Sequence, residues 1–242
     1  MTDKDVAFEN KLVIFGCGFI GQGVLPLIFR HIHILPEQVT VVTAEERGRE
    51  VAEYYGVKFV IDPVDPKNYK EVMGKYLGKG DFLLNLSSDV ESNWLIDWCC
   101  EKEVLYLDTC IDSWLGENLD SSLSVSRRSL YNLRDQAVKR REKWGSDGTT
   151  AVLAHGANPG IVSHLVKKAL LNIAKDNNLN ISTPINREEW AKLAQLLDIK
   201  VIHIAERDTQ VPANRKEVGE FVNTWSIEGL VGEGLQPAEL GW

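Results

Sequence analysis

Three glycines near the N-terminus have the spacing of a phosphate-binding turn. The apolar run 11–15 is followed by Gly16, Gly18 and Gly21 in the pattern G-x-G-x-x-G, and an apolar, helix-like segment continues to His31. At such a strand-to-helix junction the first glycine allows a tight turn, the second lets a pyrophosphate touch bare backbone, and the third permits close helix packing. The helix N-terminus adds unpaired N–H groups and partial positive charge. The pattern indicates a dinucleotide site, with a ligand-free glycine turn as the weaker alternative.

The end of the second predicted strand bears on which dinucleotide would bind. An acid is typical there, about 20 residues beyond the glycines, because it holds the ribose hydroxyls. This sequence has Thr43 instead, followed by Glu45 and Glu46. Thr43 or Glu45 could accept a hydrogen bond from the ribose, whereas Arg47 would favour a 2′-phosphate that the two carboxylates oppose. NAD is therefore favoured over NADP, although the glutamates are also typical of the first turn of a helix.

Polar residues follow three other predicted strands. The three segments are Asn85–Asp89, Asp108–Asp112 and His155–Gly160. Because ligands of open parallel sheets bind beyond the carboxyl ends of the strands, we expect the segments to converge on one crevice. Asp89 and Asp112 would face an amine there, and Asn158 would press against the nicotinamide ribose. Taken singly, each segment is equally well explained by capping and turn chemistry.

Other classes of chemistry find little support in the residues. Ser, His and Asp are present without a nucleophile-elbow motif, which argues against a hydrolase. The five histidines and four cysteines show no ligand spacing, so we predict no metal site. With 27 basic and 35 acidic residues the formal charge is −8, which argues against nucleic acid and is compatible with a cationic substrate.

An alternation of strand and helix patterns would position these segments. Strands are predicted at 11–15, 38–43, 57–61, 81–86, 103–108 and 149–154, and helices at 19–31, 45–55, 66–76, 91–101 and 123–144. Ser88 and Glu91 have the spacing of a capping box before the fourth helix. Short continuous apolar strands suit a parallel sheet covered on both faces. We therefore predict an α/β fold with a doubly wound parallel-sheet Rossmann domain over residues 1–155.

Residues 156–242 are expected to begin an α+β substrate and dimerisation domain. A helix is predicted over 160–172, a second helix after the capping box Asn186–Glu189, and strands over 200–206 and 220–227. This part is short for a substrate domain and ends without a stop signal, so we expect it to be truncated.

The composition also bears on the compartment. Hydrophobic residues make up 44% of the chain, but no apolar run approaches the roughly 20 residues of a membrane helix. The N-terminus lacks a signal-peptide pattern, and the four cysteines form no disulfide framework. We expect a cytoplasmic protein without a membrane partner.

Six later motifs resemble the bacterial homospermidine synthases, members of the saccharopine-dehydrogenase-like group. They are Asn85–Ser87, Tyr106–Thr109, Gly156–Gly160, His203–Gln210, Phe221–Ser226 and Glu233–Trp242. The resemblance spans nearly the whole chain and implies an NAD-dependent aminobutyl transfer. In this reaction putrescine transfers a hydride to NAD and becomes an imine. A second putrescine attacks that imine, ammonia leaves, and the hydride returns from the reduced cofactor to the new imine. Spermidine is an alternative donor, with diaminopropane released.

The resemblance also implies roles for particular residues. Glu206, Trp225 and Asn158 would be catalytic, with Trp225 as a cation–π wall, and Asp89, Asp112 and Glu233 would bind the diamine or polyamine substrate together with Glu206. Cofactor contacts are expected from Gly16, Gly18, Phe19, Ile20, Gly21, Thr43, Asn85, Leu86, Ser87, Thr109, Asn158 and Pro159. The family pattern has Glu in place of Asp112 and an acid in place of Thr43. The family's chain continues for about as long again, and we expect a homodimer.

Two other functions stay open. One is a net NAD(P)-dependent dehydrogenase of the saccharopine or carboxyspermidine type, whose amino-acid substrate would need a cation facing its carboxylate. Arg207 is the main candidate in residues 203–242, where Glu206, Glu233 and Trp225 suit a diamine better. The other is a dinucleotide-binding module without catalysis.

Overall fold

The computed structural model describes residues 6–145, 148–207, 209, 214–223, 225–235 and 237. The chain divides into two compact units, one formed by Met1–Ala154 with Ala213–Trp242 and the other by His155–Pro212. The assignment of 156–242 to a substrate and dimerisation domain stays a prediction.

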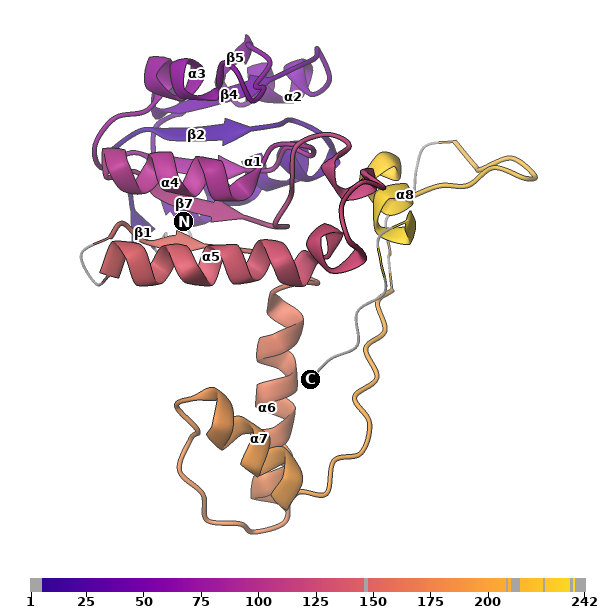
Figure 1. The fold of residues 1–242 in the computed structure, drawn as a ribbon. Coiled ribbons are helices and arrows are strands. Elements are labelled where there is room, and N and C mark those ends of the chain that lie inside the picture. The colour runs from indigo at the N-terminus through magenta and orange to yellow at the C-terminus, as the bar shows by residue number, and fades with distance from the viewer. Residues whose placement is uncertain are drawn as a thin grey trace. The chain divides into compact units, whose positions relative to one another are not determined.

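A parallel sheet of six strands forms the centre of the first unit (Figure 1). Its strands are β2 (Leu12–Phe15), β4 (Val39–Thr43), β5 (Lys58–Ile61), β6 (Phe82–Asn85), β7 (Leu105–Asp108) and β8 (Ala151–Val152). They lie in the order β5-β4-β2-β6-β7-β8. The chain adds β4 and β5 on one side of β2 and then β6, β7 and β8 on the other, so the topological switch point lies between β2 and β6. This is the strand order of a doubly wound dinucleotide-binding fold. The predicted fold class is confirmed.

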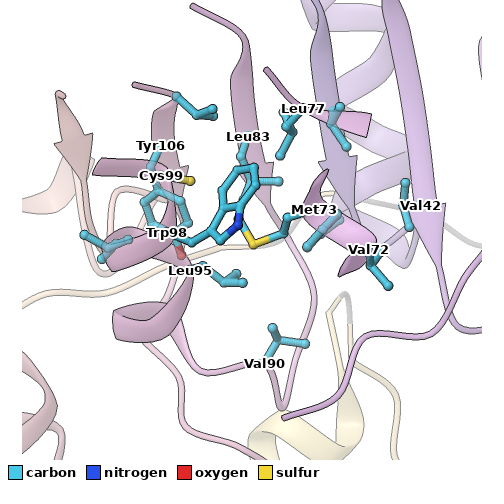
Figure 2. Packing of buried hydrophobic residues seen from close by; sticks show 14 of the residues in the cluster. Val42, Val72, Met73, Leu77, Leu83, Val90, Leu95, Trp98, Cys99 and Tyr106 are labelled. Carbon is cyan, nitrogen blue, oxygen red and sulfur yellow. The ribbon is translucent and has the colours of Figure 1, made fainter. Parts of the chain in front are cut away.

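Helices cover both faces of this sheet. They are α1 (Phe19–His31), α2 (Arg49–Tyr54), α3 (Tyr69–Tyr76), α4 (Ser92–Lys102) and α5 (Leu130–Trp144), with short 3₁₀ turns at Pro36–Gln38, Glu117–Leu119 and Val125–Arg128. Alternate residues of β2 point to opposite faces. Leu12 and Ile14 pack in the cluster that includes α1 and α2, whereas Val13 and Phe15 pack in the one that includes α3 and α4. Figure 2 shows the second cluster. A minor two-stranded sheet pairs β1 (Val6–Ala7) with β3 (Ile32–His33).

The strand register aligns the polar strand ends. Phe15 lies beside Val42 on one side and Asn85 on the other, and Asn85 lies beside Asp108. Because all these strands are parallel, their C-terminal ends form one edge of the sheet, which we call the carboxyl edge. The glycine turn after β2 and the polar segments after β6 and β7 therefore begin at this edge, as the sequence predicts.

The described residues of the second unit form two helices, α6 (Ile161–Asp176) and α7 (Arg187–Leu196), around a small core of Leu170, Ala174 and Leu193. The capping box before α7 is half confirmed. The Asn186 side chain accepts from the Glu189 N–H at 2.9 Å. The Glu189 carboxylate accepts from the Ile185 N–H and from the Asn186 side-chain amide rather than from the Asn186 backbone N–H. The capping box before α4 is wrong, because Glu91 itself is the N-cap and no side-chain cap bond forms there.

The two strands predicted over 200–206 and 220–227 are also wrong. Residues 200–206 have no regular secondary structure, and α8 (Ile227–Leu235) begins where the second strand should end. Val201 and Ile202 are 80% and 56% exposed. An alternating apolar stretch becomes a strand only when a neighbour completes its hydrogen bonds, and the described residues supply none here. In the same described residues no helix is both long and apolar enough to span a bilayer.

Candidate functional site

The glycine turn after β2 has the backbone geometry that its sequence predicts. Gly16 has a φ of +87°, and its N–H donates to the Val42 carbonyl at 2.9 Å. A Cβ on Gly16 would lie 2.9 Å from the Leu86 carbonyl oxygen, and one on Gly21 would lie 2.7 Å from the Gly16 carbonyl oxygen. A Cβ on Gly18 would meet nothing within 4 Å. Gly16 and Gly21 are thus required by the turn itself, whereas the space beside Gly18 is open.

The N-terminus of α1 follows this turn directly. Gly18 is the N-cap, so no side chain caps the helix, and the first turn carries no acidic residue. The first N–H groups of a helix lack partners within it and attract anions. Phe19 and Ile20 are 58% and 48% exposed beside them. The segment offers backbone donors for a phosphate and apolar side chains at the rim.

A glycine from another loop, Gly48, supports the turn, and the sequence did not predict this role. Gly48, the N-cap of α2, has a φ of +89°, and its Cβ would lie 2.5 Å from the Cys17 carbonyl oxygen. The Cys17 thiol donates to the Gly48 carbonyl at 3.7 Å. The loop after β4 therefore packs directly on the glycine turn. The available signal was a glycine within the predicted helix 45–55, which here begins only after Gly48.

The end of β4 carries exposed charges that are already paired. Thr43 is buried, while Glu45 and Glu46 are exposed. Arg47 forms an ion pair with Glu45 at 3.4 Å, and Arg49 forms a bidentate contact with Glu46, which lowers the pKa of that carboxyl. Each cation near this tip thus has a carboxylate partner.

The ends of β6 and β7 are joined by buried hydrogen bonds. The Asn85 amide donates to the Tyr106 hydroxyl at 3.2 Å, and Tyr106 donates to Asp108 Oδ2 at 2.8 Å. Asn85 Oδ1 accepts from the Ser87 hydroxyl at 2.5 Å, while Asp108 Oδ1 accepts from the Ala154 N–H at 2.6 Å. Burial raises the pKa of Asp108 to about 6. Asn85 and Ser87 were predicted from sequence; the buried network through Tyr106 and Asp108 was not.

The two predicted amine-binding aspartates lie together. Asp89 has a φ of +61°, and its N–H donates to Asp112 Oδ2 at 2.9 Å. The other carboxylate oxygen of Asp112 accepts from the Ser113 N–H at 2.9 Å. Burial raises the pKa of Asp112. Asp112 therefore holds the turn that presents Asp89, a role that its short side chain suits.

A buried glutamate near this pair was missed. Glu91, 5% exposed, lines a cavity of about 300 Å³ together with Asp112, Trp94, Glu117 and Arg128. Burial raises the pKa of Glu91 to about 7. The sequence pattern predicts Glu91 as half of a capping box, and nothing in that pattern distinguishes a cap from a buried carboxyl.

The remaining predicted residues belong to other segments. Asn158 and Pro159 are exposed in a loop that a Gly156 N–H to Pro159 carbonyl bond of 2.8 Å closes, and Glu206 is exposed in the second unit. Trp225 is half-buried in the first unit beside Gly229, where a Cβ would lie 2.9 Å from its ring.

Glu233 is exposed on α8. Desolvation raises the pKa of the Cys110 thiol to about 12, with smaller contributions from Asp112, Asp108 and Glu233. Thr109 follows β7 and is half-buried. Motif positions 208, 210, 224, 236 and 238–242 lie outside the described residues. Across the described part of the chain, no group of three or more His, Cys, Asp or Glu is arranged to hold a metal ion.

The sheet and its strand ends match a known protein family. Residues 12–152, which contain the sheet and all the strand ends above, match the saccharopine dehydrogenase NADP-binding domain. The chain belongs to this family. The match covers the glycine turn, the Asn85–Tyr106–Asp108 part of the buried network and the Asp89–Asp112 pair, and it stops before Ala154 and Asn158.

Three homospermidine synthases are similar over nearly all of the chain. The homospermidine synthase of Blastochloris viridis is 45% identical over 100% of this chain and 52% of its own length, and that of Mesorhizobium japonicum is 43% identical over 96% and 49%. The crystal structure of Legionella pneumophila homospermidine synthase in complex with NAD superposes with a TM-score of 0.85 and 46% identity over 99% of this chain and 49% of that one. The chain spans about half the length of these relatives.

Proposed function

We propose that the chain is the NAD-binding half of a homospermidine synthase. The observation that carries this proposal is the similarity of nearly the entire chain, in both sequence and structure, to the Legionella enzyme in complex with NAD. The similarity extends past the dinucleotide-binding domain into the segments that hold Asn158, Glu206, Trp225 and Glu233. A dinucleotide-binding fold alone would not select this reaction.

The glycine turn fits the proposed cofactor. The open space at Gly18 and the uncapped N-terminus of α1 would receive the pyrophosphate, with Phe19, Ile20 and the tips at Asn85–Ser87 and Thr109 lining the rest. NAD supplies a hydride acceptor that returns the hydride to the product imine. The family description names NADP. Because Arg47 and Arg49 are paired with Glu45 and Glu46, a 2′-phosphate would compete with carboxylates, which supports NAD.

The acidic residues fit a diamine or polyamine substrate. Asp89 and Asp112 would seat one ammonium group, with Glu206 and Glu233 at others, and the formal charge of −8 would attract the cation. Trp225 would face a cationic amine or imine, an interaction worth about 2 kcal/mol when desolvated. Asn158 and Pro159 would contact the nicotinamide ribose. A homodimer in the cytoplasm is part of the same proposal.

Product analysis tests the proposed reaction. Putrescine is supplied as sole substrate with catalytic NAD⁺, both to this chain and to any longer protein that contains it. Homospermidine and ammonia without net NADH support the proposal, and we expect them from the longer protein, with cofactor binding but weak turnover here. Stoichiometric NADH would indicate a net dehydrogenase, and NAD⁺ binding without product in either protein a non-catalytic module; both outcomes overturn the proposal.

A further inference from the structure

The carboxylate of Asp108 has no contact with solvent, yet it accepts several hydrogen bonds. It is 0% exposed at the end of β7. Tyr106 O–H donates to its Oδ2 at 2.8 Å and Ala154 N–H to its Oδ1 at 2.6 Å. The Ser92 hydroxyl at the start of α4 lies close enough to lower the pKa of this carboxyl. These three neighbours come from different elements, so Asp108 lies where β7, α4 and the end of β8 meet.

Each partner of Asp108 leads to a different part of the proposed site. The Tyr106 hydroxyl accepts from the Asn85 amide, and the Asn85 carbonyl oxygen accepts from the Ser87 hydroxyl. Asn85 and Ser87 are both proposed NAD contacts. The Ser92 hydroxyl accepts from the Asp112 N–H at 3.0 Å. Ala154, with a φ of +50°, is the residue before the His155–Gly160 segment. The three proposed groups of contacts therefore share one buried acceptor.

A carboxylate suits this position better than any neutral side chain. It offers only acceptors, and all its partners donate. An amide would direct an N–H at the Tyr106 hydroxyl, which already receives the Asn85 amide. No cation compensates the charge among the groups that shift the Asp108 pKa, so its burial opposes folding at neutral pH. Because this charge opposes folding, its presence is better explained by the groups that Asp108 positions than by a contribution to stability.

We propose that Asp108 is a positioning residue, whose ionised carboxylate holds the Asn85–Ser87 tip, the Ser92–Asp112 contact and the Ala154 backbone in the arrangement that binds cofactor and amine. It touches neither ligand, because it is fully buried. The inference rests on the proposed function for the identity of the ligands. Protonation of Asp108 would remove acceptor capacity for the same donors, so positioning weakens in acid.

Other titratable groups around Asp108 are Tyr106, Cys110 and Asp112. The pKa values of the phenol and the thiol are raised far above neutrality, so both groups stay neutral between pH 5 and 8. Asp112 is a carboxyl whose pKa burial also raises. A comparison of wild type with Asp108→Asn therefore isolates the contribution of Asp108 from that of Asp112.

The test measures NAD⁺ affinity by titration calorimetry between pH 5 and 8 on the whole 242-residue chain. In wild type we expect affinity to fall as pH drops through about 6, the pKa of Asp108. In Asp108→Asn we expect at least a tenfold loss at pH 7.5 and a flatter pH profile. Asp62→Asn is the matched control, because Asp62 accepts from Tyr76 O–H at 2.9 Å beyond β5 in a similar tyrosine–aspartate pair. It should retain wild-type affinity and pH dependence.

Hydrogen exchange at the Ala154 amide provides a readout that needs no ligand. Relative to its intrinsic rate, exchange should accelerate below pH 6 in wild type. In Asp108→Asn the amide oxygen can still accept from the Ala154 N–H but does not titrate, so exchange relative to the intrinsic rate should be independent of pH. Wild-type affinity, with a wild-type pH dependence of both affinity and Ala154 exchange, in Asp108→Asn would overturn the inference. If that variant does not fold, Tyr106→Phe decides, because it removes only the Asn85 arm and should lower affinity while Tyr76→Phe does not. If wild type binds no NAD⁺ at any pH, the proposed function fails while the exchange data still test the positioning role.

Discussion

The carboxyl edge of the sheet is built differently on its two sides. On the side of β2 and β4, the shape comes from backbone, because Gly16 and Gly48 both have positive φ and pack against other main-chain atoms. The charges on that side are exposed ion pairs. On the side of β6, β7 and β8, the arrangement comes from side chains, because Asn85, Tyr106 and Asp108 form a buried hydrogen-bonded chain.

The difference shows which perturbation each side resists. Backbone donors stay the same at any pH but tolerate no added Cβ where main-chain atoms touch. The hydrogen bonds of a buried carboxyl depend on its protonation state, so the arrangement on that side changes with pH and with substitutions that alter charge. In the proposed enzyme the first side would hold the unreactive phosphates, and the second would lie near the exchange of protons and amines.

The largest effect is expected from Gly48→Ala. The variant combines a positive φ with a Cβ 2.5 Å from the Cys17 carbonyl oxygen, so the free energy of unfolding should fall by about 2–5 kcal/mol. Gly116→Ala is the control, because its φ is +83° but its Cβ would meet nothing within 4 Å, and about 1–2 kcal/mol should be lost. Chemical denaturation measures both. Equal losses would show that the contact between the two loops adds nothing.

Gly18→Val should act on binding without affecting folding. The open space at Gly18 accepts the side chain, but the proposed pyrophosphate would approach there, so NAD⁺ affinity should fall about a hundredfold, near 2.7 kcal/mol. Gly23→Val places the same side chain on α1, also with nothing within 4 Å of its Cβ, and should keep wild-type affinity. Calorimetric titration with thermal melts measures both properties. Unchanged affinity in Gly18→Val would contradict the assignment of the turn.

The sequence allowed the backbone side of the edge to be predicted well. G-x-G-x-x-G after an apolar strand is a local pattern, and both Gly16 and Gly21 have the close backbone contacts that it implies. The strand order followed because short apolar runs alternating with helices permit few topologies. Asn85 and Asp112 were predicted as polar strand-end residues, and both lie at the edge.

The buried partnerships could not be predicted in the same way. Asp108 accepts from Ala154, 46 residues away, and Glu91 loses its solvent only when α4 and the segment up to Gln136 fold together. Such burial depends on tertiary contacts that no local spacing records. Residues 200–206 failed for a related reason, since an apolar alternation specifies a strand only with a partner.

Glu91 should make stability fall as pH rises. Its pKa is about 7 in the folded chain against 4.5 ordinarily, so the native state binds more protons than the unfolded state between these values. Wild type should therefore lose about 2 kcal/mol from this group between pH 5 and 7.5. Glu91→Gln should remove that part of the slope in denaturation curves across this range, whereas Glu101→Gln, on the same helix but exposed, should leave it unchanged. Identical slopes in Glu91→Gln and wild type would show that Glu91 is solvated.

The smallest effect is expected for the choice between NAD and NADP at the end of β4. On this side of the edge the backbone sets the shape, but exposed charges should set the cofactor preference. In the double variant Glu45→Gln/Glu46→Gln, Arg47 loses its partner and Arg49 keeps the longer contact with Glu53 at 3.8 Å, so both cations become more available to a 2′-phosphate. Exposed pairs are worth about 0.2–1 kcal/mol each, so the ratio of NADP⁺ to NAD⁺ affinity should rise a few-fold. Because exposed charges are screened, the rise should shrink as salt increases. Titrations with both dinucleotides at two salt concentrations measure it, with Glu101→Gln as the control for one lost surface charge. A ratio that does not move, or a wild type that already prefers NADP⁺, would show that these carboxylates do not select the cofactor.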